Sequence, residues 1–126
     1  MNNFIYSSQV KEAINQHSPI VALESTVITH GLPQPKNYEV ALAMENEVLK
    51  ENAVPATICL IDGVIRVGID NNELKTLAQT TNSVKVSRKD IAYAVSFGLN
   101  GGTTVSGTMT VAHAAGIKVF ATGGIG

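Results

Sequence analysis

The sequence predicts an α/β layered fold with a mixed β-sheet, and three observations lead to this prediction. Short apolar runs alternate along the chain with segments that carry apolar residues at helical spacing. The pair Asp62-Gly63 separates two β-rich runs, which is typical of a tight hairpin between antiparallel strands. The chain has 126 residues, which is enough for one domain with a real core and too few for two ordinary domains.

Composition narrows the class of protein. Apolar residues make up 44% and charged residues 15% of the chain, as in globular proteins rather than disordered ones. The formal net charge is −1 and the basic residues are scattered, which argues against a nucleic acid or an acidic membrane surface as the main partner. Residues 1–13 do not resemble a signal peptide, no apolar run has the length of a membrane span, and Cys59 stands alone in an apolar run. We therefore expect a cytoplasmic protein with a buried, reduced thiol.

The first predicted elements lead from a helix through a strand to an irregular loop. Residues 8–17 form the helix, because apolar residues recur in them at helical spacing and Ser18-Pro19 closes the segment. Residues 20–23 are an apolar run and predict a buried strand. The stretch 24–37, ESTVITHGLPQPKN, contains two prolines and a glycine and fits neither periodicity. We expect a loop there, and loops of this length inside compact domains are often functional.

The next helix is expected from Asn37, as its N-cap, to about residue 52. Its pattern is amphipathic. Five apolar residues are predicted to face inward and four charged ones to face solvent: Val40, Ala41, Met44, Val48 and Leu49, against Glu39, Glu45, Glu47 and Lys50. The hairpin around Asp62-Gly63 follows, within residues 55–68.

Capping patterns place the later helices. Asp70 and Glu73 have the spacing of a capping box at the start of a helix over residues 70–79. Ser87 and Asp90 repeat this spacing after a short strand at residues 83–86, and that helix ends near Gly98.

The last part of the chain predicts a helix of small residues and then a strand. Residues 107–116 form the helix, which Gly116 ends, and residues 117–121 read as a buried strand. A glycine-rich turn follows this strand and runs to Gly126, and in α/β folds such a turn delivers the chain to a covering helix. We therefore expect residues 1–126 to be one partial domain, truncated on its C-terminal side.

Glu24 is the first candidate for chemistry. It ends an apolar strand and is followed by two hydroxyl residues, Ser25 and Thr26. One interpretation is a strand end that reaches water. The other is a carboxyl acid in a half-buried site, where partial desolvation lets it hold a proton near neutral pH and donate it.

Two glycine-rich stretches, residues 98–110 and 121–126, are candidates for anion binding. Glycine exposes backbone N–H groups, and hydroxyl side chains accompany them. Neither stretch matches the P-loop or the dinucleotide fingerprint. Tight turns and close helix packing are the alternative explanation. The hydroxyl residues in the two stretches include Thr103, Thr104, Ser106 and Thr122.

Several basic residues also have two interpretations. Lys85 alternates with two valines at the end of a strand, so it points either into a ligand cleft or, as an edge-strand lysine, into solvent. Arg88 and Lys89 are expected to be solvated charges in a first helical turn. His30 is either a site residue or a hydrogen-bond donor within its loop, and we favour the donor.

Four segments, in this order, closely resemble the N-terminal part of the pseudouridine-5′-phosphate glycosidase family, also called the indigoidine-synthase-A-like family. The resemblance covers residues 19–126. The segments are ALESTVITHGLPQP, AVPATICLIDGVIRVG, KVSRKDI and GLNGGTTVSGTMTVAHAAGIKVFATGGIG.

This resemblance implies a fold and a reaction. The implied fold is a three-layer α/β/α sandwich in a homotrimer. The implied enzyme is a pseudouridylate synthase or glycosidase, of the carbon–oxygen lyase class. It reversibly cleaves the C–C glycosidic bond of pseudouridine 5′-phosphate to ribose 5-phosphate and uracil, with breakdown as the physiological direction. The implied cofactor is a divalent metal, typically Mn²⁺, and a lysine holds the opened sugar covalently.

The resemblance also implies roles for four residues. Glu24, in the ALEST motif, matches the family's proton donor. Lys85, in the KVSR motif, matches a lysine that contacts the substrate. Val105 matches a valine that meets the substrate through its backbone, and Thr122 matches a threonine that helps to hold the phosphate.

The chain departs from the family pattern after the ATGGIG motif, whose last residue is Gly126. The family's nucleophilic lysine and metal-binding aspartate lie beyond Gly126, so we expect no metal ligand and no nucleophile in these residues. The chain alone is then expected to be inactive, and poorly stable or self-associated because a sheet without its later helices exposes apolar faces. An alternative is a non-catalytic remnant that binds ribose phosphate and oligomerises.

Overall fold

Strand β3 (Val54–Ile61) organises the fold of this protein, which is described here from a computed structural model over residues 3–125. It is eight residues long, and six of them are buried. Its side chains alternate between two cores, because successive residues of a strand point to opposite faces of a sheet. Ala56 and Ile58 enter one core and Cys59 enters the other. Cys59 is a free, fully buried thiol, as the sequence predicts.

One side of the sheet is built on the predicted hairpin. Strand β4 (Val64–Val67) pairs antiparallel with the second half of β3. Asp62 and Gly63 form the turn with φ angles of 50° and 75°, the left-handed conformation that a tight hairpin turn requires. A short strand that the sequence did not reveal, β1 (Ile5–Tyr6), pairs parallel with β4.

The other strands attach to β3 in two groups. The first half of β3 pairs with the parallel strand β2, which in turn pairs with the parallel strand β7. The second half pairs with the antiparallel strand β6, which pairs with the parallel strand β5. Within residues 3–125 the seven strands form one mixed sheet. The bounds are β2 (Ile20–Leu23), β5 (Val84–Val86), β6 (Gly101–Thr103) and β7 (Val119–Ala121).

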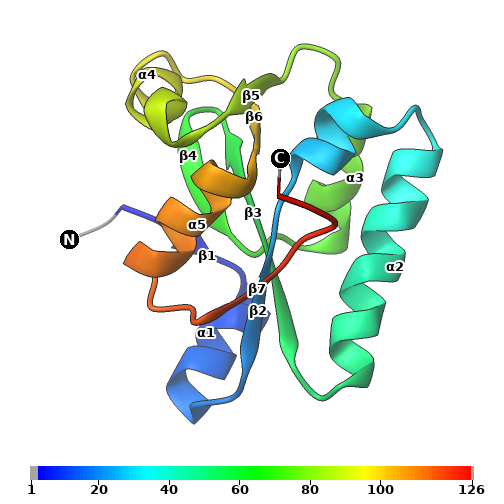
Figure 1. Ribbon diagram of the computed structural model, residues 1–126, viewed down its shortest axis with the longest axis vertical. Helices are drawn as coiled ribbons and strands as arrows, with labels where there is room; N and C mark the ends of the chain where they lie inside the picture. The colour runs from blue at the N-terminus through cyan, green and yellow to red at the C-terminus, as the bar shows by residue number, and fades with distance from the viewer. Residues whose placement is uncertain (1–2, 126) are drawn as a thin grey trace.

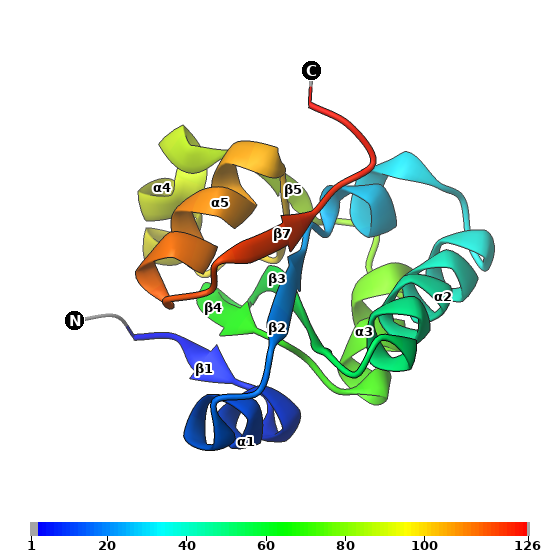
Figure 2. The same ribbon diagram turned by 60° about the horizontal axis from the view of Figure 1, so that its bottom comes forward.

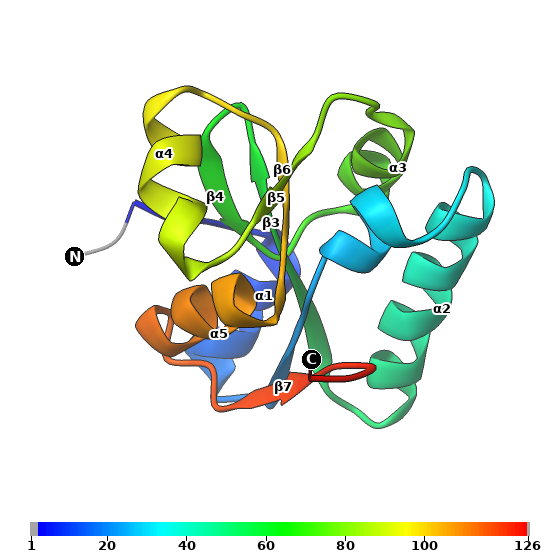
Figure 3. The ribbon, with the colours of Figure 1, turned by 45° about the horizontal axis from the view of Figure 1, so that its top comes forward.

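Helices cover both faces of the sheet, which makes the three-layer arrangement that the family resemblance implies (Figures 1 and 3). One layer holds α1 (Ser8–Gln16), α4 (Ile91–Ser96) and α5 (Val105–Ala114), and the other holds α2 (Lys36–Lys50) and α3 (Asn71–Gln79). No helix within residues 3–125 combines the length and the apolar character needed to cross a membrane.

The C-terminal boundary of the predicted partial domain is not tested by the structure. Gly126, the residue at which we placed the truncation, lies outside the described residues. Between the end of β7 and residue 125 the chain forms no further helix or strand. The covering helix expected after the glycine-rich turn therefore stays a prediction about sequence beyond Gly126.

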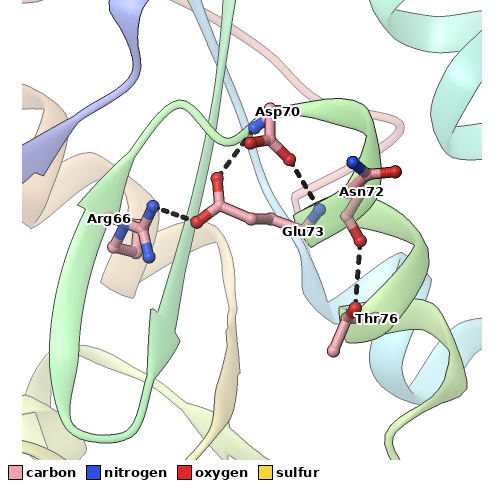
Figure 4. A network of polar contacts seen from close by, with 5 residues as sticks. All are labelled: Arg66, Asp70, Asn72, Glu73 and Thr76. Atoms are coloured by element: carbon pink, nitrogen blue, oxygen red, sulfur yellow. Dashed lines mark hydrogen bonds and ion pairs between the residues drawn. The ribbon is translucent and has the colours of Figure 1, made fainter.

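The predicted helix boundaries are confirmed where capping residues define them. At the start of α3, Asp70 Oδ1 accepts a hydrogen bond from Glu73 N (2.7 Å), and Asp70 N donates to Glu73 Oε1 (3.0 Å) (Figure 4). Arg66 pairs with the other oxygen of Glu73. Ser87 N donates to Asp90 Oδ2 (3.0 Å) before the 3₁₀ turn at Arg88–Asp90 that leads into α4. Gly98 and Gly116 follow α4 and α5 with positive φ angles.

Asn37 does not cap α2, so that prediction was wrong. The helix begins at Lys36, and Asn37 lies in its first turn, 4% exposed. Its side-chain Nδ2 donates to the carbonyl oxygens of Ile28 (3.0 Å) and Ala78 (2.8 Å). The side-chain amide of Asn37 therefore has its hydrogen-bond partners on other segments. Its two bonds join α2 to the end of α3 and to the segment that precedes α2.

The predicted outward face of α2 was also wrong at one position. Glu45 is 8% exposed and accepts a hydrogen bond from Thr57 Oγ1 (2.6 Å) on β3. Leu49, expected inside, is 44% exposed. Glu45 is therefore buried between α2 and β3 with a hydroxyl partner, whereas Leu49, near the end of the helix, stays open to solvent.

Two further predictions are corrected. Residues 117–121 were expected to form a buried strand, but within residues 3–125 β7 lies at the edge of the sheet, beside β2 (Figure 2). Its residue Val119 is 56% exposed. An edge strand has a neighbour on one side only, so its side chains stay partly open to solvent. The stretch predicted as an irregular loop contains a five-residue π-helix, η1 (Val27–Gly31).

The buried Glu45 gives a pH-dependent prediction. Burial raises the pKa of its carboxyl above 4.5, and the Thr57 hydroxyl opposes this less strongly. Because the folded state favours the protonated acid, the free energy of unfolding falls as pH rises from about 4.5 through the raised pKa. Glu45→Gln does not titrate. Its stability relative to wild type should therefore rise as pH increases from about 4.5 through the raised pKa of Glu45, measured by urea unfolding.

The matched control is Glu47→Gln on the exposed side of the same helix, where the side chain of Glu47 is 71% exposed. Its stability should follow that of wild type across the same pH range. A difference between wild type and Glu45→Gln that stays constant with pH would contradict the role given to burial.

Candidate functional site

The carboxyl ends of β2 and β6 meet beside the middle of β3. Strand β2 runs parallel to β3 and ends with Leu23 opposite Thr57. Strand β6 runs the opposite way, with Gly102 opposite Cys59, so its last residue reaches the level of Ile58. We call this place the strand junction. Ligands of open α/β sheets bind at the carboxyl ends of strands, which makes the strand junction the candidate site.

Buried hydroxyl groups hold the strand junction together. The carbonyl oxygen of Ile58 accepts hydrogen bonds from Ser25 Oγ (2.5 Å) and Thr103 Oγ1 (2.7 Å). Thr103 N donates to Ser25 Oγ (2.8 Å), and Thr108 Oγ1 lies 2.8 Å from Thr103 Oγ1. Both Ser25 and Thr103 are fully buried. The sequence pattern predicted no such role for these residues. The available signal was a hydroxyl side chain two residues after β2, at Ser25, and another at the end of β6, at Thr103.

Glu24 lies at the strand junction, between β2 and Ser25, and is half-buried. Its carboxylate accepts a hydrogen bond from Thr122 Oγ1. Thr122 directly follows β7, and the pairing of Leu23 with Ala121 brings the two residues together although 98 positions separate them in the sequence. The structure thus brings two of the four residues implied by the family resemblance into contact.

Val105 and Thr122 line one open groove between α5 and β7, with a volume of about 620 Å³. Val105 is the first residue of α5, whose N-cap Thr104 accepts from Gly107 N (3.3 Å). Glu24 and Lys85 do not line this groove, although Thr122 reaches from it to Glu24. The other lining residues are mainly apolar: Met109, Ala112, His113, Gly116, Ile117, Lys118, Phe120 and Ile125.

Lys85 lies in the middle of β5 and is exposed, in register with Gly102 on β6. Paired residues of neighbouring strands project to the same face of a sheet. A Cβ on Gly102 would overlap Thr29 and come within 3.0 Å of the Ser25 carbonyl oxygen. Lys85 therefore emerges on the face of the sheet that carries Ser25 and Thr29. Within residues 3–125 no hydrogen bond or ion pair joins it to Glu24.

Close packing explains Gly102 and Gly107 in the first glycine-rich stretch. A side chain on Gly102 would overlap Thr29, and one on Gly107 would overlap the Val86 carbonyl oxygen. The two described glycines of the second stretch, at positions 123 and 124, have open space around them. Close packing and the turn at Gly98, whose φ angle is positive, therefore account for glycines of the first stretch, whereas packing among the described residues does not require Gly123 or Gly124.

The described residues do not form a metal site. Within residues 3–125, no three side chains of His, Cys, Asp or Glu come together as metal ligands. The residues present therefore do not fit the manganese ion that the family resemblance implies. The resemblance places the metal-binding aspartate beyond Gly126, which itself lies outside the described residues, so that ligand stays a prediction.

Sequence comparison gives a family and close relatives. The family profile described as "Indigoidine synthase A like protein" matches residues 9–126. A pseudouridine-5′-phosphate glycosidase from Mycoplasmopsis agalactiae is 52% identical over 98% of this chain, and one from Escherichia coli is 50% identical over 95%. The matches span 41% and 39% of those relatives, so this chain spans about two fifths of their length.

Two solved structures share the fold over the whole chain. The prealnumycin C-glycosynthase AlnA, in complex with ribulose 5-phosphate, superposes with a TM-score of 0.87 at 37% identity. An indigoidine synthase A-like protein from Thermotoga maritima superposes with a TM-score of 0.85 at 29% identity. This chain covers 40% and 41% of those two chains.

The packing of Gly102 can be tested with a matched pair of glycines. Gly102→Ala should lower the free energy of unfolding by about 1–3 kcal/mol, because the added methyl group overlaps Thr29 beneath the strand junction. Gly123→Ala, which adds a methyl group in open space, should change it by less than about 0.5 kcal/mol. Urea unfolding measures both. Equal stabilities of the two variants would show that Gly102 is not required by packing.

Proposed function

This chain belongs to the family of indigoidine synthase A like proteins, and on that premise we propose that it forms the acid/base part of a pseudouridine-5′-phosphate glycosidase site. Such an enzyme cleaves pseudouridine 5′-phosphate to ribose 5-phosphate and uracil. The names of the curated relatives support this reaction. Since the chain spans about two fifths of those relatives, the proposal concerns only the share of the site that these residues form.

Glu24 is the proposed proton donor, and its contact with Thr122 is the observation that carries the proposal. The bond to be broken joins two carbon atoms, so there is no leaving oxygen to protonate. The departing uracil carbon must gain a proton instead, and a positioned carboxyl group can supply it. The Thr122 hydroxyl donates to one oxygen of the Glu24 carboxylate, which supports a fixed orientation of this group, and in the proposal the other oxygen faces the substrate.

Lys85, Val105 and Thr122 are the proposed contacts to the sugar phosphate. Lys85 offers an exposed ammonium group on the Ser25 face of the sheet, where it suits a phosphate or sugar oxygen as a point charge. Val105 begins α5, and backbone N–H groups at the start of a helix favour anions. The AlnA structure holds ribulose 5-phosphate, also a pentose phosphate, which supports this class of ligand.

The role of Glu24 can be tested in a chimera that replaces the matching part of the Escherichia coli relative with this chain. Glu24→Gln keeps the size of the side chain and removes its titrating proton. Uracil release from pseudouridine 5′-phosphate should fall by about 10²–10⁴-fold, with ribose 5-phosphate binding largely kept.

The control is Glu47→Gln, an exposed glutamate on α2, in the same chimera. Its turnover should match that of the unmodified chimera. A Glu24→Gln chimera within about threefold of the unmodified one would reject Glu24 as the proton donor.

Lys85→Ala should weaken ribose 5-phosphate binding by roughly 1.5–3 kcal/mol, the scale of a hydrogen bond to a charged group. Titration calorimetry of the chimera measures this loss. Lys89→Ala, which removes another exposed lysine, is the control and should bind as the unmodified chimera does. A borohydride-reduced sugar adduct on Lys85 would contradict the role, because it would make Lys85 the nucleophile.

A further inference from the structure

Both ring nitrogens of His30 have hydrogen-bond partners in other groups of the chain. Nδ1 lies 2.6 Å from Thr29 Oγ1, and Nε2 lies 3.0 Å from the carbonyl oxygen of Ser83. A carbonyl oxygen only accepts, so Nε2 must carry the hydrogen of the neutral ring. Nδ1 then accepts from the Thr29 hydroxyl. These partners select the Nε2–H tautomer.

The Nε2 bond joins two segments that carry different parts of the candidate site. His30 belongs to η1, which begins three residues after Glu24. Ser83 lies directly before β5, two residues ahead of Lys85. The hydrogen bond of His30 therefore links η1, which follows Glu24 in the chain, to the residue that precedes β5.

Strand β5 has few other attachments at its beginning. It is three residues long, and β6 is its strand neighbour within residues 3–125. Val84 N donates to Asn100 O (2.9 Å), but the buried Ser83 Oγ has no hydrogen-bond partner among the described residues. The hydrogen bond from His30 thus adds a tie directly before the first residue of β5.

We propose that His30 is a positioning residue that fixes β5, and with it Lys85, relative to the segment that carries Glu24. The significance for catalysis rests on the proposed function, because it assumes that Lys85 binds the substrate. The positioning itself does not depend on that assumption. A π-helical turn at η1 presents Thr29 and His30 side by side to their partners, a use typical of such turns near functional sites.

The first test needs no variant. ¹⁵N NMR of the imidazole rings in the 126-residue chain, at a pH where the rings are neutral, reports which nitrogen carries the hydrogen. His30 should show a protonated Nε2 and an unprotonated Nδ1. An Nδ1–H tautomer, or a mixture like that of a free imidazole, would overturn the proposal.

The second test separates positioning from general damage. His30→Ala removes the tie, so amide hydrogen exchange at residues 84–86 should become about five- to tenfold faster. His30→Gln can still donate from Nε2 to the Ser83 carbonyl oxygen and should restore exchange to within about twofold of wild type. His17→Asn, at the exposed left-handed C-cap of α1, is the control and should leave exchange at residues 84–86 unchanged.

Two outcomes of the exchange experiment would overturn the proposal. One is unchanged exchange at residues 84–86 in His30→Ala. The other is equally fast exchange in His30→Gln and His30→Ala, which would show that the donated hydrogen bond is not what holds β5. Ribose 5-phosphate titration of the same proteins isolates the proposed function. If the wild-type chain does not bind ribose 5-phosphate, the proposed substrate role of Lys85 fails in this chain. The NMR measurement of the His30 tautomer and the hydrogen-exchange rates of β5 still decide whether His30 is a positioning residue.

Discussion

The carbonyl oxygen of Ile58 lies at the point where the strand beside β3 changes from β2 to β6. Much of the structure depends on which groups donate hydrogen bonds to this oxygen. Before this point along the chain β3 pairs with β2, and after it with β6. A buried carbonyl without a partner is costly, and a ladder that changes strands interrupts the regular supply of donors. Ser25 and Thr103 both donate a hydroxyl hydrogen to Ile58. Two side chains thus replace the backbone hydrogen bonds that are missing where β3 changes its neighbouring strand.

This arrangement explains why the candidate site lies where it does. Because β2 and β6 approach from opposite directions, the chain leaves both strands at the strand junction. Glu24 directly precedes the anchored Ser25, and the start of α5 closely follows the anchored Thr103. Each functional segment is therefore held by a buried neighbour while its own groups stay accessible. Rigid support directly beside an open polar group is the arrangement that precise positioning of a functional side chain requires.

Glu45 and Glu24 each accept a hydrogen bond from a threonine, but their surroundings differ. Glu45 lies between α2 and β3, bonded to Thr57, and burial dominates its electrostatics. Glu24 lies at the open end of the sheet, bonded to Thr122. The sequence pattern of α2 predicted a solvated Glu45, since alternation of charged and apolar residues does not reveal a hydroxyl on a strand 12 residues away. Asn37 was misassigned for the same reason, because its partners lie on other elements.

The sequence by itself determined the features that depend on neighbouring residues. The Asp62-Gly63 hairpin, the capping box at Asp70 and the helix end at Gly98 follow from local backbone preferences. The role of Glu24 as proton donor, which its motif suggested, stays a prediction. Tertiary structure alone decided that β7 is an edge strand, that glycines at 101–102 form β6, and that Glu24 meets Thr122. Those outcomes depend on strand order and register, which bring together residues 98 positions apart and leave no periodic signal in the sequence between them.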